Sequence, residues 1–170
     1  MSEEQARSQW KADRTTFQRI YDVLAGTRTF STAASYAERA DCSETAARNA
    51  LEQLAEMGIA ARRDGRPAGY RRNESYFRWK RIESLAREHS REELHQRIED
   101  LVAEDEAFQT AYGVPEPAAV STTNLPPDDH DAVQERWEEV SNWRTVRRDI
   151  RDLRRAVERA ETRADDGVFA

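Results

Sequence analysis

The stretch from residue 43 to residue 73 constrains the fold of this chain more than any other, because it joins a helix with clear end signals to two short strands. Ser43 is a favourable N-cap residue, and Glu44 puts a negative charge in the first turn. Gly58 stands where helices commonly end in a left-handed residue. Between these signals, apolar residues recur at helical spacing and predict one buried face: Ala47, Ala50, Leu51, Leu54 and Met57.

A β-hairpin is predicted directly after this helix. The segments IAARR and AGYRRN, which begin at Ile59 and Ala68, have the composition of short strands, and the residues between them favour a tight turn. Because the apolar face of the helix must meet a core, Thr45, Arg48 and Asn49 are expected to face solvent. The fold class that this pattern predicts is mainly α-helical with a small β-hairpin.

Two further helices are predicted before residue 43. The polar residues 1–9 are expected to be frayed, a first helix should run from residue 10 to about residue 25, and Gly26 should stop it. Ser31 or Thr32 caps the second helix. The inward-facing residues of that helix are expected to be Ala34, Tyr36 or Ala37, and Ala40.

The turn between the second and third helices contains Asp41 and Cys42. Glycine is common at such a tight turn, but aspartate tolerates a left-handed backbone better than most residues do. Cys42 occupies a position that usually holds a buried aliphatic side chain. A helix, a short turn and a second helix, with small residues where the helices cross, form the helix-turn-helix arrangement.

Residues 15–73 resemble the winged helix-turn-helix domain of ArsR/MarR-like transcriptional regulators. The motifs that carry the resemblance are SYAERADCSETAARNALEQLAEMGIAARR and the returning strand GYRRN. The chain as a whole is similar to uncharacterised winged-helix proteins of halophilic archaea. The resemblance implies that double-stranded DNA is the partner, with a recognition helix in the major groove and a wing along the backbone or in the minor groove.

The resemblance also implies which residues contact DNA. Arginine suits the edge of guanine and asparagine the edge of adenine, while arginines on a hairpin suit phosphates or a narrow minor groove. The alternative for Arg48 is an ion pair with Glu44 or Glu52 along the same helix. The expected DNA-binding residues are Ser43, Thr45, Arg48 and Asn49 on the helix, and Arg62, Arg63, Arg66, Arg71 and Arg72 on the wing.

The net charge of -6 conceals an asymmetry between two parts of the chain. Residues 1–80 carry 14 Lys and Arg against 11 Asp and Glu, whereas residues 81–170 carry 13 against 22. A basic patch on an acidic body suits phosphate contacts, and a solvated charged hairpin is the alternative. Lys11 and Lys80 are the only lysines, and this composition resembles that of haloarchaeal proteins. In molar salt the Debye length is about 3 Å, which favours short-range arginine hydrogen bonds over diffuse attraction.

The C-terminal half is predicted to consist of helices around a proline-rich linker. We expect a winged helix-turn-helix domain at residues 10–89, a helical extension at residues 90–112, a linker at residues 113–130 and a long helix at residues 131–165. A helix of 30 residues spans about 45 Å, too long for a small core to bury. Its coiled-coil-like seam is therefore expected to form a homodimer, and folding back onto residues 91–112 is the alternative. The seam residues are Trp143, Val146, Ile150, Leu153 and Val157.

The sequence also argues against several classes of protein. Cys42 is the only cysteine, so an intramolecular disulfide is impossible and a reducing, cytoplasmic setting is expected. No signal peptide and no apolar run of about 20 residues is present, so no membrane partner is expected. Sequence motifs for phosphate-binding loops, nucleophiles or metal ligands are missing, and the three histidines are scattered, so we expect no enzyme activity, metal or cofactor.

The prediction for function is a homodimeric, sequence-specific DNA-binding transcriptional regulator. Two alternatives remain open. One is a protein-interaction adaptor built on a winged-helix domain. The other is a metal- or redox-gated regulator, in which Cys42 would have to be exposed with a lowered pKa.

Overall fold

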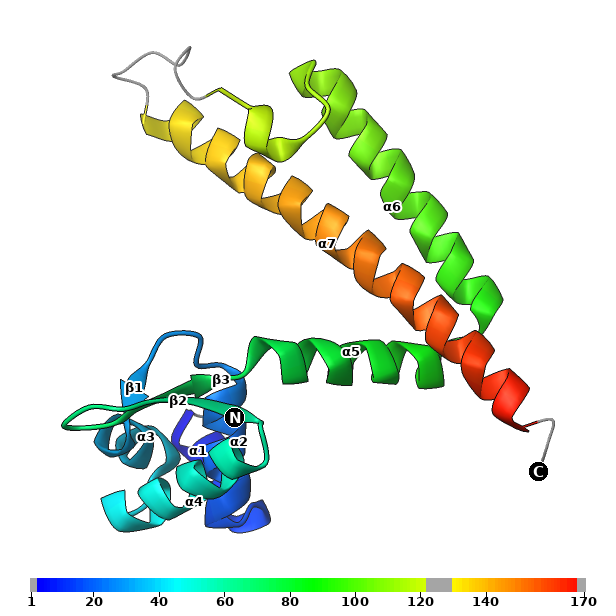
Figure 1. The fold of residues 1–170 in the computed structure, drawn as a ribbon. Helices are drawn as coiled ribbons and strands as arrows, with labels where there is room; N and C mark the ends of the chain where they lie inside the picture. Colours follow the sequence, from blue (N-terminus) through cyan, green and yellow to red (C-terminus); the bar gives the residue numbers. More distant parts are fainter. Residues whose placement is uncertain (1–2, 122–129, 168–170) are drawn as a thin grey trace. The chain divides into compact units, whose positions relative to one another are not determined.

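The computed structural model describes residues 3–121 and 130–167, which are mainly helical with one small antiparallel sheet (Figure 1). The expected fold class, mainly α-helical with a small β-hairpin, is confirmed. The elements in chain order are α1 (Glu3–Asp13), α2 (Thr16–Ala25), β1 (Ser31–Thr32), α3 (Ala33–Ala40), α4 (Glu44–Glu56), β2 (Ala60–Arg63), β3 (Gly69–Arg72), α5 (Glu74–Glu88), α6 (Arg91–Tyr112), the 3-10 helix η1 (Pro117–Ala119) and α7 (His130–Gly167).

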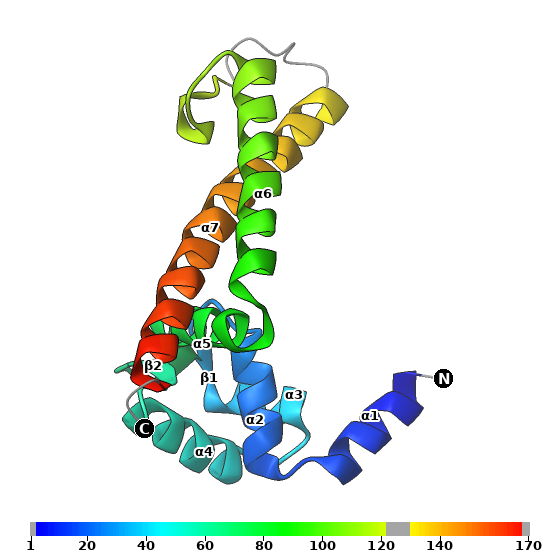
Figure 2. The ribbon, with the colours of Figure 1, turned by 90° about the vertical axis from the view of Figure 1, so that its right-hand side faces the viewer.

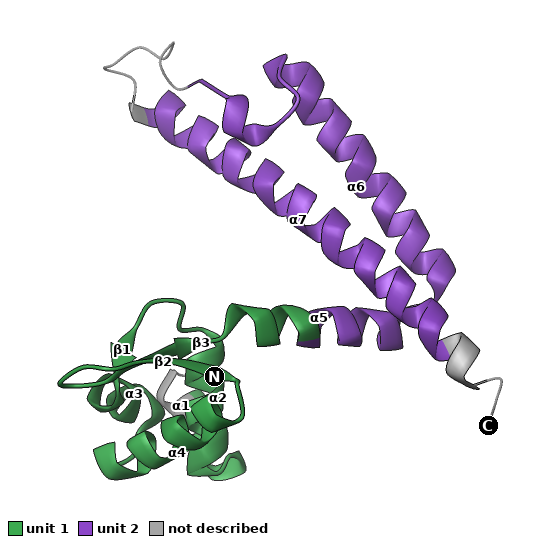
Figure 3. Ribbon diagram, viewed as in Figure 1, with its two compact units in different colours: residues 1–79 green, residues 80–170 purple. Residues whose placement is uncertain are grey.

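The chain divides into two compact units, Met1–Trp79 and Lys80–Ala170 (Figure 3). The division lies within α5, whereas the sequence predicted a boundary after residue 89. The two ends of α5 explain the difference, because they belong to separate apolar clusters. Tyr76 and Phe77 pack against the core of the first unit, and Ile82, Leu85 and Ala86 pack against the core of the second.

The core of the first unit lies among α2, α3 and α4. Its largest fully buried side chains are Tyr36, Tyr70, Ile20, Leu24, Leu51 and Leu54, and alanines fill the places where the helices approach closely. The hydroxyl of Tyr36 donates a hydrogen bond of 3.2 Å to the backbone carbonyl of Tyr70, which joins α3 to β3. The predicted inward face of α3 is correct except at Ala34, which is exposed while Ala33 is buried.

The predicted first helix is in fact two helices. α1 already begins at Glu3, so the expectation that residues 1–9 are frayed is wrong for the described part of that segment. Thr15 interrupts the helical run and caps α2. Its hydroxyl accepts a hydrogen bond of 3.2 Å from the backbone N–H of Gln18, and its own N–H donates one of 2.9 Å to the Gln18 side chain. This capping box is readable as T-x-x-Q in the sequence.

The sheet contains one strand that the sequence analysis did not predict. The strand order is β1-β3-β2, with antiparallel pairing throughout. β1 has only two residues, too few for a pattern of alternation. One of them, Thr32, also caps α3 as expected, since its hydroxyl accepts a hydrogen bond of 3.3 Å from the N–H of Ser35.

Both predicted left-handed positions next to α4 are confirmed. Asp41 has φ 51° and ψ 59° at the end of α3, and Gly58 has φ 74° after α4. The backbone N–H of Ile59 then bonds to the carbonyl of Leu54 at 2.9 Å. Met57 does not belong to the buried stripe, because α4 ends before it and its side chain is 63% exposed.

The second unit pairs α6 with α7, which lie side by side in both views of the ribbon (Figures 1 and 2). Leu94 on α6 and Leu153, Ala156 and Val157 on α7 form a buried apolar cluster. Trp143 stacks on two α6 rings, those of Phe108 and Tyr112, at centroid distances of 5.7 and 5.9 Å. The linker predicted at residues 113–130 contains η1, and residues 122–129 lie outside the described residues.

The predicted dimer seam is corrected by this packing. All five seam residues are buried within the second unit of a single chain, with exposed fractions of 0–7%. α6 covers the apolar stripe of α7, which is the fold-back arrangement that the sequence left as the alternative. These side chains are therefore not available to a second copy: Trp143, Val146, Ile150, Leu153 and Val157.

Candidate nucleic-acid interface

The outward face of α4 carries the polar residues that the sequence singled out. Thr45, Arg48 and Asn49 are exposed, as expected, while the intervening stripe is buried in the core. Ser43 is exposed too, and its hydroxyl accepts a hydrogen bond of 3.2 Å from the N–H of Ala46. Ser43 therefore has a structural role as the N-cap of α4, whatever else it contacts.

Arg48 forms an ion pair with Glu44 one turn earlier on α4. Both side chains are about half exposed, at 52% each. An exposed pair at this spacing stabilises a helix by only about 0.2–0.5 kcal/mol. The pair that the sequence offered as an alternative for Arg48 therefore exists, and it is weak enough to be exchanged for a ligand.

A groove of about 510 Å³ lies beside this face of α4. Its walls come from the start of α3, from α4 and from the β2–β3 hairpin. Arg48, Arg62 and Arg66 line it together with the carboxylates of Glu44 and Glu52. The groove thus combines hydrogen-bond donors and acceptors, with a small excess of positive charge.

The hairpin presents its arginines on two different faces. In the register of β2 with β3, Arg62 lies opposite Tyr70 and Arg63 lies opposite Gly69, so neighbouring arginines point to opposite sides of the sheet. Arg62 lines the groove and pairs with Asp64 at 3.3 Å. Arg63 and Arg71 both lie over the ring of Phe30 on the other face.

Arg72 differs from the other predicted wing residues, because its side chain is directed into the first unit. It donates a hydrogen bond of 2.8 Å to the carbonyl of Ala25, pairs with Glu74 at 2.9 Å and lies 4.7 Å from the ring centroid of Phe77. Its side chain is only 17% exposed. The expectation that Arg72 contacts DNA is corrected, since its guanidinium ties the α2 end and α5 to the sheet.

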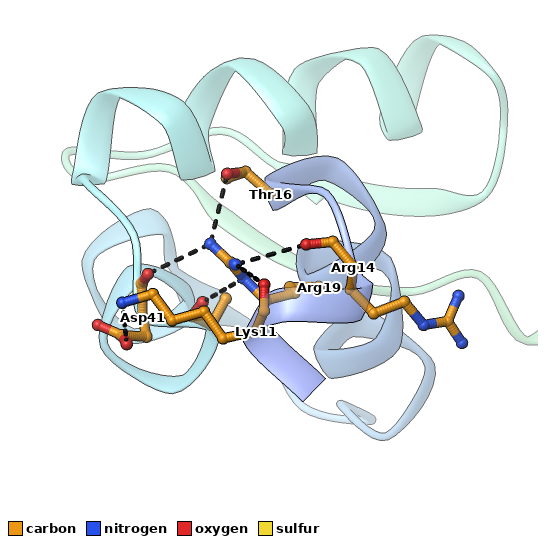
Figure 4. A network of polar contacts seen from close by, with 6 residues as sticks. Lys11, Arg14, Thr16, Arg19 and Asp41 are labelled. Carbon is orange, nitrogen blue, oxygen red and sulfur yellow. Dashed lines mark hydrogen bonds and ion pairs between the residues drawn. The ribbon is translucent and has the colours of Figure 1, made fainter. Parts of the chain in front are cut away.

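Arg19 holds the helix pair together, and the sequence analysis missed it. Arg19 is 7% exposed, and its guanidinium donates hydrogen bonds to backbone carbonyls from two separate turns (Figure 4). On one side these are Lys11 at 3.2 Å and Arg14 at 3.5 Å, and on the other Ala40 at 3.0 Å and Asp41 at 3.4 Å. Arg19 therefore positions the turn from which α4 begins.

Asp41 closes the same network with its side chain. Its carboxylate pairs with the ammonium group of Lys11 at 2.6 Å, which joins α1 to the turn before α4. No local sequence pattern predicts this arrangement. The one available signal is that Arg19 stands directly beside the apolar residue Ile20 in α2.

Cys42 packs against the core of the first unit, as expected for an aliphatic position. Burial raises the pKa of its thiol, which disfavours the reactive thiolate. Within residues 3–121 and 130–167, no His, Cys, Asp or Glu side chains gather in groups of three or more that would suit a metal ion. No helix in the same residues has both the length and the apolar character for crossing a membrane.

The comparisons with known proteins assign the chain to a family. A family of unknown function (DUF7342) matches residues 14–161, and since this match covers most of the sequence, the chain belongs to it. No curated protein and no solved structure matches the chain.

Proposed function

We propose that this member of the DUF7342 family is a DNA-binding transcriptional regulator of the winged helix-turn-helix type. The observation that carries the proposal is the row of Thr45, Arg48 and Asn49, which are exposed on one face of α4 beside a groove lined by hairpin arginines. In this proposal α3 and α4 are the helix-turn-helix, α4 is the recognition helix and the β2–β3 hairpin is the wing.

The chemistry of the exposed row suits the edges of base pairs. An α-helix fits the major groove of B-DNA, where arginine can bind guanine through two hydrogen bonds and asparagine can bind adenine in the same way. Arg48 would exchange its carboxylate partner Glu44 for a base, at the small cost of an exposed helical ion pair. Arg62 and Arg66 would then lie close to the phosphates that border the groove.

The distribution of charge supports short-range contacts rather than diffuse attraction. Glu44 and Glu52 stand in the same groove as the arginines, and carboxylates are repelled by phosphate. Affinity must therefore depend on specific arginine and amide hydrogen bonds. Such contacts persist at the high ionic strength that the composition suggests, where long-range attraction is screened.

Dimerisation through the seam of α7 is not part of this proposal, because those residues are buried within one chain. The number of protein chains that bind one DNA site follows from the same experiment that tests the proposal. Purified protein is used to select bound fragments from random duplex DNA, at low and at molar salt.

We expect one motif to be enriched, and two inverted copies of it would indicate that two chains bind together. The test variant is Thr45→Ala, Arg48→Ala, Asn49→Ala, whose side chains are all exposed. The control is Arg151→Ala, Arg154→Ala on exposed positions of α7. Loss of the motif in the test variant alone supports the proposal. No enrichment with the folded wild type, or the same enrichment with the test variant, would overturn it.

A further inference from the structure

The outer face of the sheet carries a second basic surface, separate from the groove beside α4. The guanidinium carbons of Arg63 and Arg71 each lie 4.6 Å from the ring centroid of Phe30. An aromatic ring attracts a cation that lies within about 6 Å of its centroid. One ring therefore holds two positive charges from two different strands.

The strand register and one glycine build this arrangement. Gly69 lies opposite Arg63 in β2 and opposite Thr32 in β1, at the centre of the sheet. A Cβ atom at Gly69 would come within 3.3 Å of the Cβ of Phe30, closer than most real contacts. The absence of a side chain at Gly69 thus leaves room for the side chain of Phe30 against β3, the strand that also carries Arg71.

Neither arginine has a carboxylate partner in the part of the chain that the structure describes. Asp64, the acidic residue next to Arg63, pairs with Arg62 on the opposite face, and Glu74, the acidic residue nearest to Arg71 in sequence, pairs with Arg72. Arg63 and Arg71 are both exposed. Two like charges fixed beside one ring repel each other, and an anion between them would remove that repulsion. An oxygen-rich anion suits two guanidinium groups best, because each can donate parallel N–H hydrogen bonds.

We propose that Arg63 and Arg71 clamp a phosphodiester group of DNA, and that Phe30 is the positioning residue that holds both guanidinium groups in place. This inference rests on the proposed function. Since Arg62 and Arg66 line the groove on the other face, the hairpin would contact phosphates on both of its sides. We call Phe30, Arg63 and Arg71 the outer clamp.

The outer clamp can be tested through the salt dependence of DNA binding. The affinity of the full chain for a selected duplex is measured over a series of KCl concentrations in which circular dichroism shows the fold intact. Each phosphate contact contributes about 0.9 to the slope of log K against log salt. Because both arginines hold one phosphate, we expect for Arg63→Ala, Arg71→Ala a slope lower by about 0.9, and for Arg151→Ala, Arg154→Ala on α7 an unchanged slope.

Variants of Phe30 separate positioning from charge. Phe30→Leu keeps an apolar side chain on Gly69 but removes the aromatic face, so we expect an affinity about tenfold lower at each salt concentration. Phe30→Tyr keeps the ring and should bind like the wild type. A merely structural role would give equal losses in both variants or a lowered melting temperature.

The outcomes distinguish the clamp from the proposed function. If the wild type binds DNA and the Arg63, Arg71 variant keeps the wild-type slope, the outer clamp is wrong and the proposed function stands. If Phe30→Leu binds like the wild type, Phe30 has no positioning role. If the folded wild type binds no duplex at any salt concentration, both the proposed function and the clamp are overturned.

Discussion

The Nε atom of Arg19 donates a hydrogen bond to the backbone carbonyl of Ala40 over a distance of 3.0 Å. Ala40 is the last residue of α3, so this bond ties α2 to the turn that precedes α4. The carbonyl groups at the end of a helix have no partner within the helix, and a buried one that loses its donor is costly. The orientation of α4 on the core therefore depends on a charged side chain as well as on apolar packing.

We predict that Arg19→Met destabilises the first unit by about 2–3 kcal/mol, because the substitution preserves apolar volume but leaves several backbone carbonyls without a donor. Chemical denaturation followed by circular dichroism would measure the loss. Arg14→Met is the matched control, since the Arg14 side chain is 46% exposed. Equal midpoints for the two variants would contradict the role given to Arg19.

The network around Arg19 also marks the limit of prediction from this sequence. Local signals predicted the caps of α3 and α4 and the left-handed residues Asp41 and Gly58, because each depends on neighbours close in sequence. Two hydrogen bonds of Arg19 reach the carbonyl groups of Ala40 and Asp41, which are 21 and 22 positions away in the sequence. No local pattern encodes contacts over such a separation. The same is true of β1, whose two residues form a strand only because β3 lies beside them.

The candidate site was predictable where it depends on helical periodicity. The spacing of the α4 stripe correctly predicted that Thr45, Arg48 and Asn49 are exposed. It did not reveal that the hairpin arginines take three different positions. Arg62 and Arg66 line the groove, Arg63 and Arg71 lie on the outer face, and Arg72 is directed into the first unit. That division depends on strand register and on the position of Phe30, which comes from a loop before β1. Register is set by tertiary packing, so composition alone showed only a basic hairpin.

The inward position of Arg72 predicts a contrast with Arg66. Arg72→Ala should lower the free energy of unfolding by about 1–3 kcal/mol, because the carbonyl of Ala25 loses its donor and Phe77 loses the guanidinium that covers it. Arg66→Ala should leave stability within about 0.5 kcal/mol, since Arg66 is exposed in the hairpin loop. Thermal unfolding of both variants checks this, and an unstable Arg66 variant would argue against the assignment.

Arg48 is expected to determine specificity more than overall affinity. Arg48→Ala should cost about 1–3 kcal/mol at one base pair of the selected motif and should make that position tolerant of other bases. The measurement is binding to a set of duplexes that differ by single base pairs. Arg66→Ala, in contrast, should weaken binding to all members of the set by a similar factor. If Arg48→Ala leaves the ranking of the duplexes unchanged, Arg48 does not read a base.

The pairing of α6 with α7 predicts how a charged side chain changes stability at the residues that the sequence had predicted as a dimer seam. Leu153→Asp should destabilise the second unit by at least about 3 kcal/mol, because it buries a carboxylate in the apolar cluster around Leu94. Arg154→Asp introduces the same carboxylate at an exposed neighbouring position and should have little effect. Unfolding curves combined with light scattering would check both. A folded Leu153→Asp variant with a lower molar mass than the wild type would instead restore the dimer seam.

Two carboxylates of the second unit predict how its stability changes with pH. A hydrogen bond from Arg159 holds the pKa of Glu83 below its ordinary value of 4.5, and Arg163 pairs with the same carboxylate. A hydrogen bond from Arg147 likewise lowers the pKa of Asp105 from 3.8. These contacts join α5 and α6 to α7, so protonating either carboxylate weakens the packing of the second unit.

The sign of the effect follows from the direction of both pKa shifts. A group with a lowered pKa in the folded state binds protons more weakly than it does in the unfolded chain. Its stabilisation is complete above the ordinary pKa and is lost as the pH falls through the lowered folded value. The urea concentration at the unfolding midpoint of the second unit should therefore decrease once the pH drops below about 4.5. The double variant Glu83→Gln, Asp105→Asn should show a smaller decrease. Glu99→Gln, on an exposed position of α6, is the control, and an equal decline in all three proteins would show that neither contact contributes.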